Sequence, residues 1–205
     1  MPRAGLSRRD VIAAAAELAD EVGFQQLTMG LLAQRLGIRT PSLYKHVTDL
    51  ADLKHGVATQ AMTEVGEEVR DVLQGRSGRD ALTALLGTMR SYAMTHPGQY
   101  AAANSTRLTG PDDPLLAASS RVIDSISAAL RGYGIADADM VHAIRTIRST
   151  IHGFALLQET DGFQWSPEPS ISFDWMIEFI DRGLQALASG AAPMSGVARA
   201  QDPGD

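Results

Sequence analysis

Residues 27–47 read LTMGLLAQRLGIRTPSLYKHV, and this stretch decides the fold of the N-terminal part of the chain. Thr28 has the side chain of a helix N-cap, and the apolar spacing that follows it, closed by a glycine, predicts a short helix. Thr40 again has N-cap chemistry and Pro41 suits a first helical position, so a further helix is expected to run through Val47. Two short helices joined by so tight a turn are typical of a helix-turn-helix motif.

A first helix is expected just upstream of this stretch. Ser7 is a plausible N-cap with Asp10 three residues on, and apolar residues then recur at helical spacing as far as Gly23. Together the three helices predict a helix-turn-helix DNA-binding domain over residues 1–48.

The third of these helices carries the candidate DNA contacts. Leu43 and Val47 lie four residues apart and can anchor it inward. Side chains at its start can reach base edges, because arginine pairs with guanine and apolar surfaces meet thymine methyl groups; these are Arg39, Thr40, Pro41 and Ser42. Side chains further along can hold phosphates: Tyr44, Lys45 and His46. The alternative is that the tyrosine and histidine only pack at a helix end and the lysine is a solvated charge.

Composition and charge limit the classes of protein that fit. The chain has 205 residues, of which 44% are hydrophobic, and a net charge of -6. Up to Val47 there are six Lys and Arg against four Asp and Glu, which leaves +2 in this segment and -8 in the rest. A locally positive face on an acidic protein can still bind DNA if the acidic bulk points away. Cysteine is absent, which excludes disulfides and thiolate chemistry.

The sequence gives no sign of a membrane span or of export. No apolar run approaches the roughly 18 residues that a spanning helix requires, and no signal-peptide pattern opens the chain. We therefore expect a soluble, cytoplasmic protein without membrane association.

Beyond residue 48 the helical periodicity continues, and no convincing set of alternating strands is found. Breaks rich in Gly and Pro at 75–78, 96–98, 110–111 and 132–134 divide the segment into amphipathic helices. The chain is therefore predicted to be all-α, with a larger helical bundle over residues 49–188. Residues 189–205 are rich in Ala, Gly, Ser and Pro and are predicted to be a disordered tail.

Two late helices indicate dimerisation. From Asp137 onward one apolar stripe runs at alternating spacings of four and three, and in the last helix Trp175 and Phe179 lie on a different side from the main stripe. A helix that is apolar on two sides must bury both. We predict a homodimer whose interface includes Ile144, Ile151, Trp175 and Phe179. The alternative is a helix buried entirely within one bundle.

The stretch from Leu27 to Val47 resembles the TetR family of transcriptional regulators, and its Thr-Pro-Ser-Leu-Tyr, one residue, His order resembles the tetracycline-repressor branch. The resemblance covers about the first 55 residues. It implies that Thr28, Tyr44 and His46 contact phosphates, that residues 39–42 read bases, and that a dimer binds paired half-sites of an operator, with repression as the family default.

One position departs from the family pattern. Many members have a lysine at the start of the fourth helix, where this chain has Leu50, and Lys54 lies one turn later. The grip on the DNA backbone is then expected to be weaker, or to depend on Arg3, Arg8 and Arg9.

The C-terminal part resembles a TetR C-terminal domain with a Trp-His-Gly signature. Residues 151–154 keep the His-Gly pair but lack the Trp. This resemblance implies a small-molecule pocket and a four-helix dimer interface. Candidate pocket residues, mostly apolar with a few polar tips, are Met89, Tyr92, Met94, Tyr100, His152, Phe154 and Trp165. Each of them can equally be an ordinary core residue, and neither a cofactor nor a metal ion is predicted.

Two other classes of function fit the sequence less well than a regulator. An enzyme is disfavoured because the five histidines show no close metal-ligand spacing, and because nucleophile-elbow and phosphate-loop motifs are missing. A structural DNA-binding protein without a ligand would have a filled bundle, so a cavity in the C-terminal half discriminates against it. For a regulator, we expect a ligand to favour a bundle arrangement that separates the two recognition helices. The fourth helix is expected to carry this coupling, since it alone leads directly from the recognition helix into the bundle.

Overall fold

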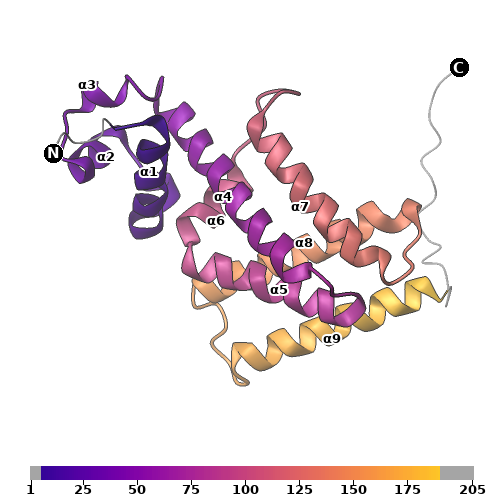
Figure 1. Ribbon diagram of the computed structural model, residues 1–205. Coiled ribbons are helices and arrows are strands. Elements are labelled where there is room, and N and C mark those ends of the chain that lie inside the picture. The colour runs from indigo at the N-terminus through magenta and orange to yellow at the C-terminus, as the bar shows by residue number, and fades with distance from the viewer. Residues whose placement is uncertain (1–5, 190–205) are drawn as a thin grey trace, which may run out of the picture.

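The computed structural model describes residues 6–189, and within that range it contains helices and no strand. The elements are α1 (Arg8–Val22), η1 (Phe24–Gln26), α2 (Met29–Leu36), α3 (Thr40–Leu43), α4 (Leu50–Leu73), α5 (Gly78–Thr95), α6 (Pro97–Ser105), α7 (Pro114–Arg131), α8 (Asp137–Glu159) and α9 (Pro169–Ala188). Figure 1 shows α1 to α3 gathered at one end and α4 running from them into the bundle of α5 to α9. The all-α prediction is confirmed. Arg3 and residues 190–205 of the predicted tail lie outside the described residues.

None of the helices in the described part of the chain is long and apolar enough to cross a membrane.

The helix starts are set by side chains that are recognisable in the sequence. Ser7 and Asp10 form a capping box on α1, in which the Ser7 N–H donates to the Asp10 carboxylate at 2.9 Å and the Asp10 N–H donates to the Ser7 hydroxyl at 3.2 Å. Asp49 accepts from the Asp52 N–H at 2.8 Å and so caps α4. At α3 the prediction is wrong by one residue, because Arg39 is the N-cap and Thr40 is already helical.

Two hydrophobic clusters form the core. The first joins α1, α2 and α3 to the start of α4, and it also takes in Ala102 of α6 and Leu115 of α7. The second fills the bundle from the end of α4 to α9. Because the first cluster includes residues on both sides of residue 48, the three N-terminal helices pack directly onto the bundle. The domain boundary expected there stays a prediction.

The two late helices bury the stripes that the sequence indicated. In α8 the buried residues include Met140, Ile147, Ile151 and Phe154. In α9 they include Phe173, Met176, Ile177, Ile180 and Leu184, whereas Trp175 and Phe179 stay 67% and 65% exposed. The expectation that α9 is apolar on two sides is therefore confirmed.

The start of α6 lies very close to the end of α1. A Cβ atom on Gly98 would overlap the carbonyl group of Ala19 and lie 2.6 Å from the amide nitrogen of Asp20. These are backbone atoms, which cannot move aside unless α1 itself shifts. A residue without a side chain is therefore needed where the bundle meets the N-terminal helices.

We predict that Gly98→Ala lowers the free energy of unfolding by about 1 to 3 kcal/mol, because the added methyl group forces α1 and α6 apart. Chemical denaturation followed by circular dichroism measures this change. The matched control is Gly87→Ala in α5, where an added Cβ meets nothing within 4 Å. Since alanine favours a helix over glycine, the control is expected to stabilise the protein by up to about 1 kcal/mol. Equal stability of the two variants would contradict a steric constraint at α6.

Candidate functional site

The segment that begins with α3 lies at the outer edge of the molecule (Figure 1) and carries polar and cationic residues. Leu43 and Val47 are buried and anchor the segment, as predicted. The predicted DNA-contact residues between positions 39 and 46 all keep accessible surface: Arg39, Pro41, Tyr44 and Lys45 are exposed, and Thr40, Ser42 and His46 are half-buried. A row of donors therefore faces outward from a buried apolar anchor.

The regular helix in this segment is shorter than predicted, because α3 ends at Leu43 and turns follow it. The Leu43 carbonyl accepts from the His46 N–H at 2.8 Å and from the Val47 N–H at 3.1 Å. The His46 carbonyl accepts instead from the Arg8 guanidinium at 2.9 Å. The prediction of one helix through Val47 is therefore wrong: residues 44–46 form turns, in which the Lys45 and His46 amides bond to carbonyls three residues back.

Arg8 clamps the turn after α3 to the start of α4. Its guanidinium donates to both carboxylate oxygens of Asp52, at 2.6 and 2.9 Å, and Asp52 also accepts from the Thr48 N–H at 2.8 Å. The Arg8 guanidinium holds the pKa of Asp52 well below its usual range, although burial acts in the opposite direction. Arg8, which the sequence suggested as an aid to phosphate binding, is thus engaged within the protein. The clamp fixes the direction in which the chain leaves the donor row.

Several acidic side chains of the N-terminal helices are engaged in contacts within the protein. Arg35 of α2 pairs with Glu17 at 2.9 Å and with Glu21 at 2.7 Å, both on α1. Asp10 serves the capping box of α1. The local charge that remains at the donor row is therefore set mainly by the cations Arg39 and Lys45.

Thr28, the predicted phosphate contact on α2, is exposed and caps that helix. Its hydroxyl oxygen accepts from the Leu31 N–H at 3.2 Å. A hydroxyl that accepts in this way keeps its own proton to donate to an anion.

Lys54 does not replace the lysine that is missing at position 50. Its ammonium group lies 3.4 Å from the Gln25 carbonyl and 5.1 Å from the centre of the Phe24 ring. Leu50 itself is half-buried against the N-terminal core. The Lys54 side chain therefore links α4 to η1.

A polar contact joins α1 to α6. The Asp20 carboxylate accepts from the Gln99 N–H at 2.9 Å and from the Gln99 side-chain amide at 2.7 Å, and it lies 3.1 Å from Nδ1 of His96. Gln99 is buried. α6 thus makes a direct contact with α1, beside the path through α4, and the expectation that α4 carries the coupling from the recognition helix stays a prediction.

α4 is fastened to the start of α7 as well. Nε2 of His55 lies 3.0 Å from the carboxylate of Asp113, which caps α7. Burial raises the pKa of Asp113, but hydrogen bonds from Thr109, Leu115 and His55 outweigh burial and hold it well below its usual range. Polar contacts therefore hold α4 to the start of α7 and α6 to α1.

The structure does not gather the predicted pocket residues into one cavity. Tyr92 is buried with its hydroxyl 3.4 Å from Glu64, and burial raises the pKa of Tyr92 above its usual range. The Tyr100 hydroxyl lies 3.2 Å from Nδ1 of His152, which joins α6 to α8, and burial raises the pKa of Tyr100 to about 12. Met89 is half-buried against the bundle core. These side chains act as core and as links between helices.

Phe154 and Trp165 lie in contrasting environments. Phe154 is buried with its ring centre 4.8 Å from that of Phe163 and 5.2 Å from that of Phe173. Trp165, in the loop between α8 and α9, is 91% exposed. Trp165 therefore does not line the hollow found in the bundle, and its assignment to a ligand pocket is not supported.

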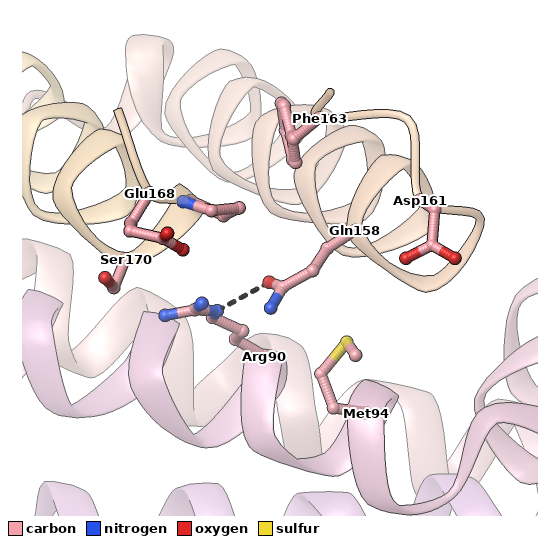
Figure 2. Close-up of a pocket in the computed structure, with 8 residues that line it drawn as sticks. Arg90, Met94, Gln158, Asp161, Phe163, Glu168 and Ser170 are labelled. Carbon is pink, nitrogen blue, oxygen red and sulfur yellow. Dashed lines mark hydrogen bonds between the residues drawn. The ribbon is translucent and has the colours of Figure 1, made fainter. Parts of the chain in front are cut away.

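A hollow of about 380 Å³ opens between the ends of α5 and α8 and the start of α9 (Figure 2). Met94 is the predicted pocket residue that lines it. The sequence reasoning missed the others, which are Arg90, Gln158, Asp161, Phe163, Glu168, Pro169 and Ser170. No local pattern marks them, because they meet only when three separate segments pack.

An apolar surface lies on the outer side of α9. The Trp175 and Phe179 rings are stacked, with centres 5.4 Å apart and planes 13° apart. Ile171, one turn earlier, is 58% exposed. Of the predicted interface residues on α8, Ile144 is half-buried, whereas Ile151 is completely buried. Including Ile151 was wrong, because its side chain already packs inside its own subunit.

No group of three or more His, Asp or Glu side chains that could hold a metal ion occurs within residues 6–189.

Comparison with known proteins assigns the chain to a family. Residues 11–48 match the bacterial regulatory proteins of the tetR family, and residues 82–180 match the tetracyclin repressor-like C-terminal domain. The chain is 35% identical over 157 residues to an uncharacterized HTH-type transcriptional regulator of Mycobacterium tuberculosis, covering 77% of this chain and 72% of that protein. The chain belongs to the TetR family. It is a DNA-binding transcriptional regulator with a ligand-binding domain and not an enzyme, and the resemblance inferred from residues 27–47 is confirmed.

Solved structures of TetR-family proteins share the fold. A TetR variant of Acinetobacter baumannii in complex with minocycline has a TM-score of 0.70 at 24% identity, covering 91% of this chain and all of that chain. BioQ with its natural double-stranded DNA operator has a TM-score of 0.65 at 23% identity, covering 89% of this chain and 99% of that chain. The arrangement of helices is thus that of the TetR family along almost the whole chain.

In this TetR-family member, we predict that Asp52→Asn lowers the free energy of unfolding at pH 7 by about 1 to 2 kcal/mol, because the bidentate pair with Arg8 is lost. The pKa of Asp52 is depressed in the folded protein. Its contribution is therefore present above the unfolded pKa of about 4 and is lost as the pH falls toward the folded pKa. Urea denaturation at neutral and at acidic pH should show a smaller acid-induced loss in the variant.

The control is Asp71→Asn, which removes an exposed pair with Arg70 and should leave stability unchanged. An acid-induced loss as large in Asp52→Asn as in the wild type would contradict the clamp.

Proposed function

We propose that this protein is a homodimeric repressor that binds a palindromic operator and releases it when a small molecule occupies its helical bundle. The observation that carries the proposal is the outward-facing donor row at α3. It is anchored from below by buried Leu43 and Val47 and held at its end by the Arg8–Asp52 clamp. A row fixed in this way can enter a major groove without first paying a large ordering cost.

The donors divide into two kinds of contact. The side chains at the start of α3 read base edges, with Arg39 able to pair bidentately with a guanine and Pro41 able to meet a thymine methyl group. Tyr44, Lys45, His46 and Thr28 hold phosphates and so set the position of the helix without reading sequence.

The dimer forms through the apolar side of α9. Trp175 and Phe179 are large, exposed and stacked on each other, and aromatic side chains of this kind dominate the energy of protein interfaces. Two subunits related by a two-fold axis then place two α3 segments on one face of the DNA, in major grooves about 34 Å apart.

Release follows from the two connections between the bundle and the N-terminal helices. α4 is held at His55 by α7, and α6 is held at Gln99 by Asp20 of α1. A ligand that favours a different packing of the bundle moves these helices, and the spacing of the two α3 segments then no longer fits successive grooves. The minocycline complex of a TetR variant and the operator complex of BioQ support these two classes of partner.

The hollow between α5, α8 and α9 favours a ligand-responsive regulator over a purely structural DNA-binding protein. Its volume of about 380 Å³ lies within the range of small-molecule sites.

We predict that selection from a random duplex library by the wild-type protein yields a palindromic motif. Tyr44→Phe should weaken binding to all sequences alike by about three- to tenfold, since one hydrogen bond to phosphate is lost. Arg39→Ala should relax preference at one base pair of each half-site, where the change costs about 1 to 3 kcal/mol.

A Tyr44→Ala, His46→Ala double variant serves as the reference without phosphate contacts, and Arg131→Ala on α7 as the surface control that should retain the motif. If Arg39→Ala selected an unchanged motif, the assignment of base reading would be wrong. If no motif were enriched by the wild type, the proposed operator recognition would be wrong.

We predict that a Trp175→Ala, Phe179→Ala double variant is monomeric at micromolar concentration in analytical ultracentrifugation, whereas the wild type is a dimer. Loss of two aromatic anchors removes the centre of the proposed interface. Ile123→Ala, an exposed apolar residue of α7, is the matched control and should remain dimeric. A dimer that survives both aromatic substitutions would place the interface elsewhere.

A further inference from the structure

The hollow at the end of the bundle brings together side chains from three segments. Arg90 and Met94 come from α5, Gln158 from α8, and Glu168 from the start of α9. Figure 2 shows Arg90 and Gln158 between Glu168 at one end and Asp161 at the other. Charges of both signs and apolar side chains therefore share one small volume.

Arg90 is held in a fixed orientation at the hollow. Its Nε donates to the Gln158 side-chain oxygen at 2.8 Å, and the guanidinium carbon lies 4.5 Å from the centre of the Phe173 ring and 5.6 Å from that of Phe154. Within residues 6–189 its two terminal nitrogens make no hydrogen bond or ion pair. A half-buried guanidinium whose paired donors are oriented in this way is suited to a carboxylate, which it can bind through two parallel hydrogen bonds.

Two carboxylates line the same hollow and are also unpaired. Asp161 and Glu168 form no ion pair with any Lys, Arg or His in the described part of the chain, although Arg90 lies in the same hollow. Two acidic groups disfavour a ligand that carries only negative charge. They favour a ligand that brings an ammonium group together with its carboxylate.

The rest of the lining consists of one polar residue, Ser170, and three apolar residues. Met94 and Phe163 offer a surface for an aliphatic or aromatic group, and Pro169 adds to it at the start of α9. Such a surface rewards a ligand with an apolar body between or beside its two charges.

We propose that this hollow binds an amino-acid-like zwitterion with an apolar side chain. The ligand carboxylate pairs with the terminal nitrogens of Arg90, the ammonium group faces Glu168, and the apolar group lies on Met94 and Phe163. This inference rests on the proposed function, for which it names the chemical class of the effector.

The position of the hollow connects it to the N-terminal helices. Met94 lies two residues before His96, whose ring is 3.1 Å from Asp20 of α1. A ligand that draws α5 toward α8 and α9 acts on the segment that leads directly into the contact between α6 and α1. Occupancy of the hollow thus has a short path to the DNA-binding end.

Isothermal titration of the full-length protein tests the ligand class directly. The probes are L-phenylalanine and L-leucine, with 3-phenylpropanoate as the analogue that lacks the ammonium group and 2-phenylethylamine as the analogue that lacks the carboxylate. The two amino acids are expected to bind at millimolar or lower concentration. Each one-charge analogue is expected to bind at least about tenfold more weakly than L-phenylalanine, because one charged contact is missing.

Variants test the assigned contacts. Arg90→Gln should weaken L-phenylalanine binding by at least about tenfold, whereas Arg131→Gln, an exposed arginine of α7, should leave it unchanged. Because Arg90 also packs on two phenylalanine rings, an Asp161→Asn, Glu168→Gln double variant provides a test that leaves this packing intact. It should remove the preference for L-phenylalanine over 3-phenylpropanoate.

The outcomes separate this inference from the proposed function. Absence of binding by both amino acids, binding unaffected by Arg90→Gln, or a preference unchanged in the acidic double variant overturns the inference. Operator affinity is then measured with and without saturating L-phenylalanine. Binding that depends on Arg90 without any change in operator affinity supports the site and contradicts the proposed release. Release by another molecule that Arg90→Gln does not alter supports the proposed function and overturns this site as its effector site.

Discussion

The contact between the end of α1 and the start of α6 is the constraint on which the rest of the structure depends. Gly98 allows the two backbones to approach, and the Asp20 carboxylate then accepts two hydrogen bonds from Gln99 in a partly buried position. A carboxylate in such surroundings is stable only while its partners stay in place. Separating α1 from α6 would therefore leave polar groups without partners.

Two links of different kinds connect the N-terminal helices to the bundle. α4 continues the chain from α3, and the Arg8–Asp52 pair fixes the angle at which it leaves. The link through α6 is non-covalent and polar, so bundle packing can change its strength. In the proposed release, a rearrangement in the bundle reaches the N-terminal helices through these two links.

Local signals in the sequence predicted the helices well, but they did not predict the long-range contacts. Ser7 and Thr28 cap helices where expected because capping involves residues two or three apart. The stripe of α9 was also recognisable, since its period is that of one helix. Nothing local reveals that Arg8 binds Asp52, 44 residues away, or that Asp20 binds Gln99, 79 residues away.

The same distinction explains why the candidate DNA contacts were recognisable and the proposed effector site was not. Residues 39–46 are adjacent in sequence, and one helix start with its following turn displays them together. The hollow near Arg90 is formed by a few residues spread between positions 90 and 170. Each of them is an ordinary surface or boundary residue in its own segment. Its charged residues indicate a ligand site only when they are considered together. An arginine stacked on two rings is ordinary by itself, but here two unpaired carboxylates line the same hollow. A ligand site of this kind can change its specificity by substitutions at helix ends while the core, the caps and the α1–α6 contact stay the same. This separation lets one fold keep a fixed DNA-binding geometry while the effector varies.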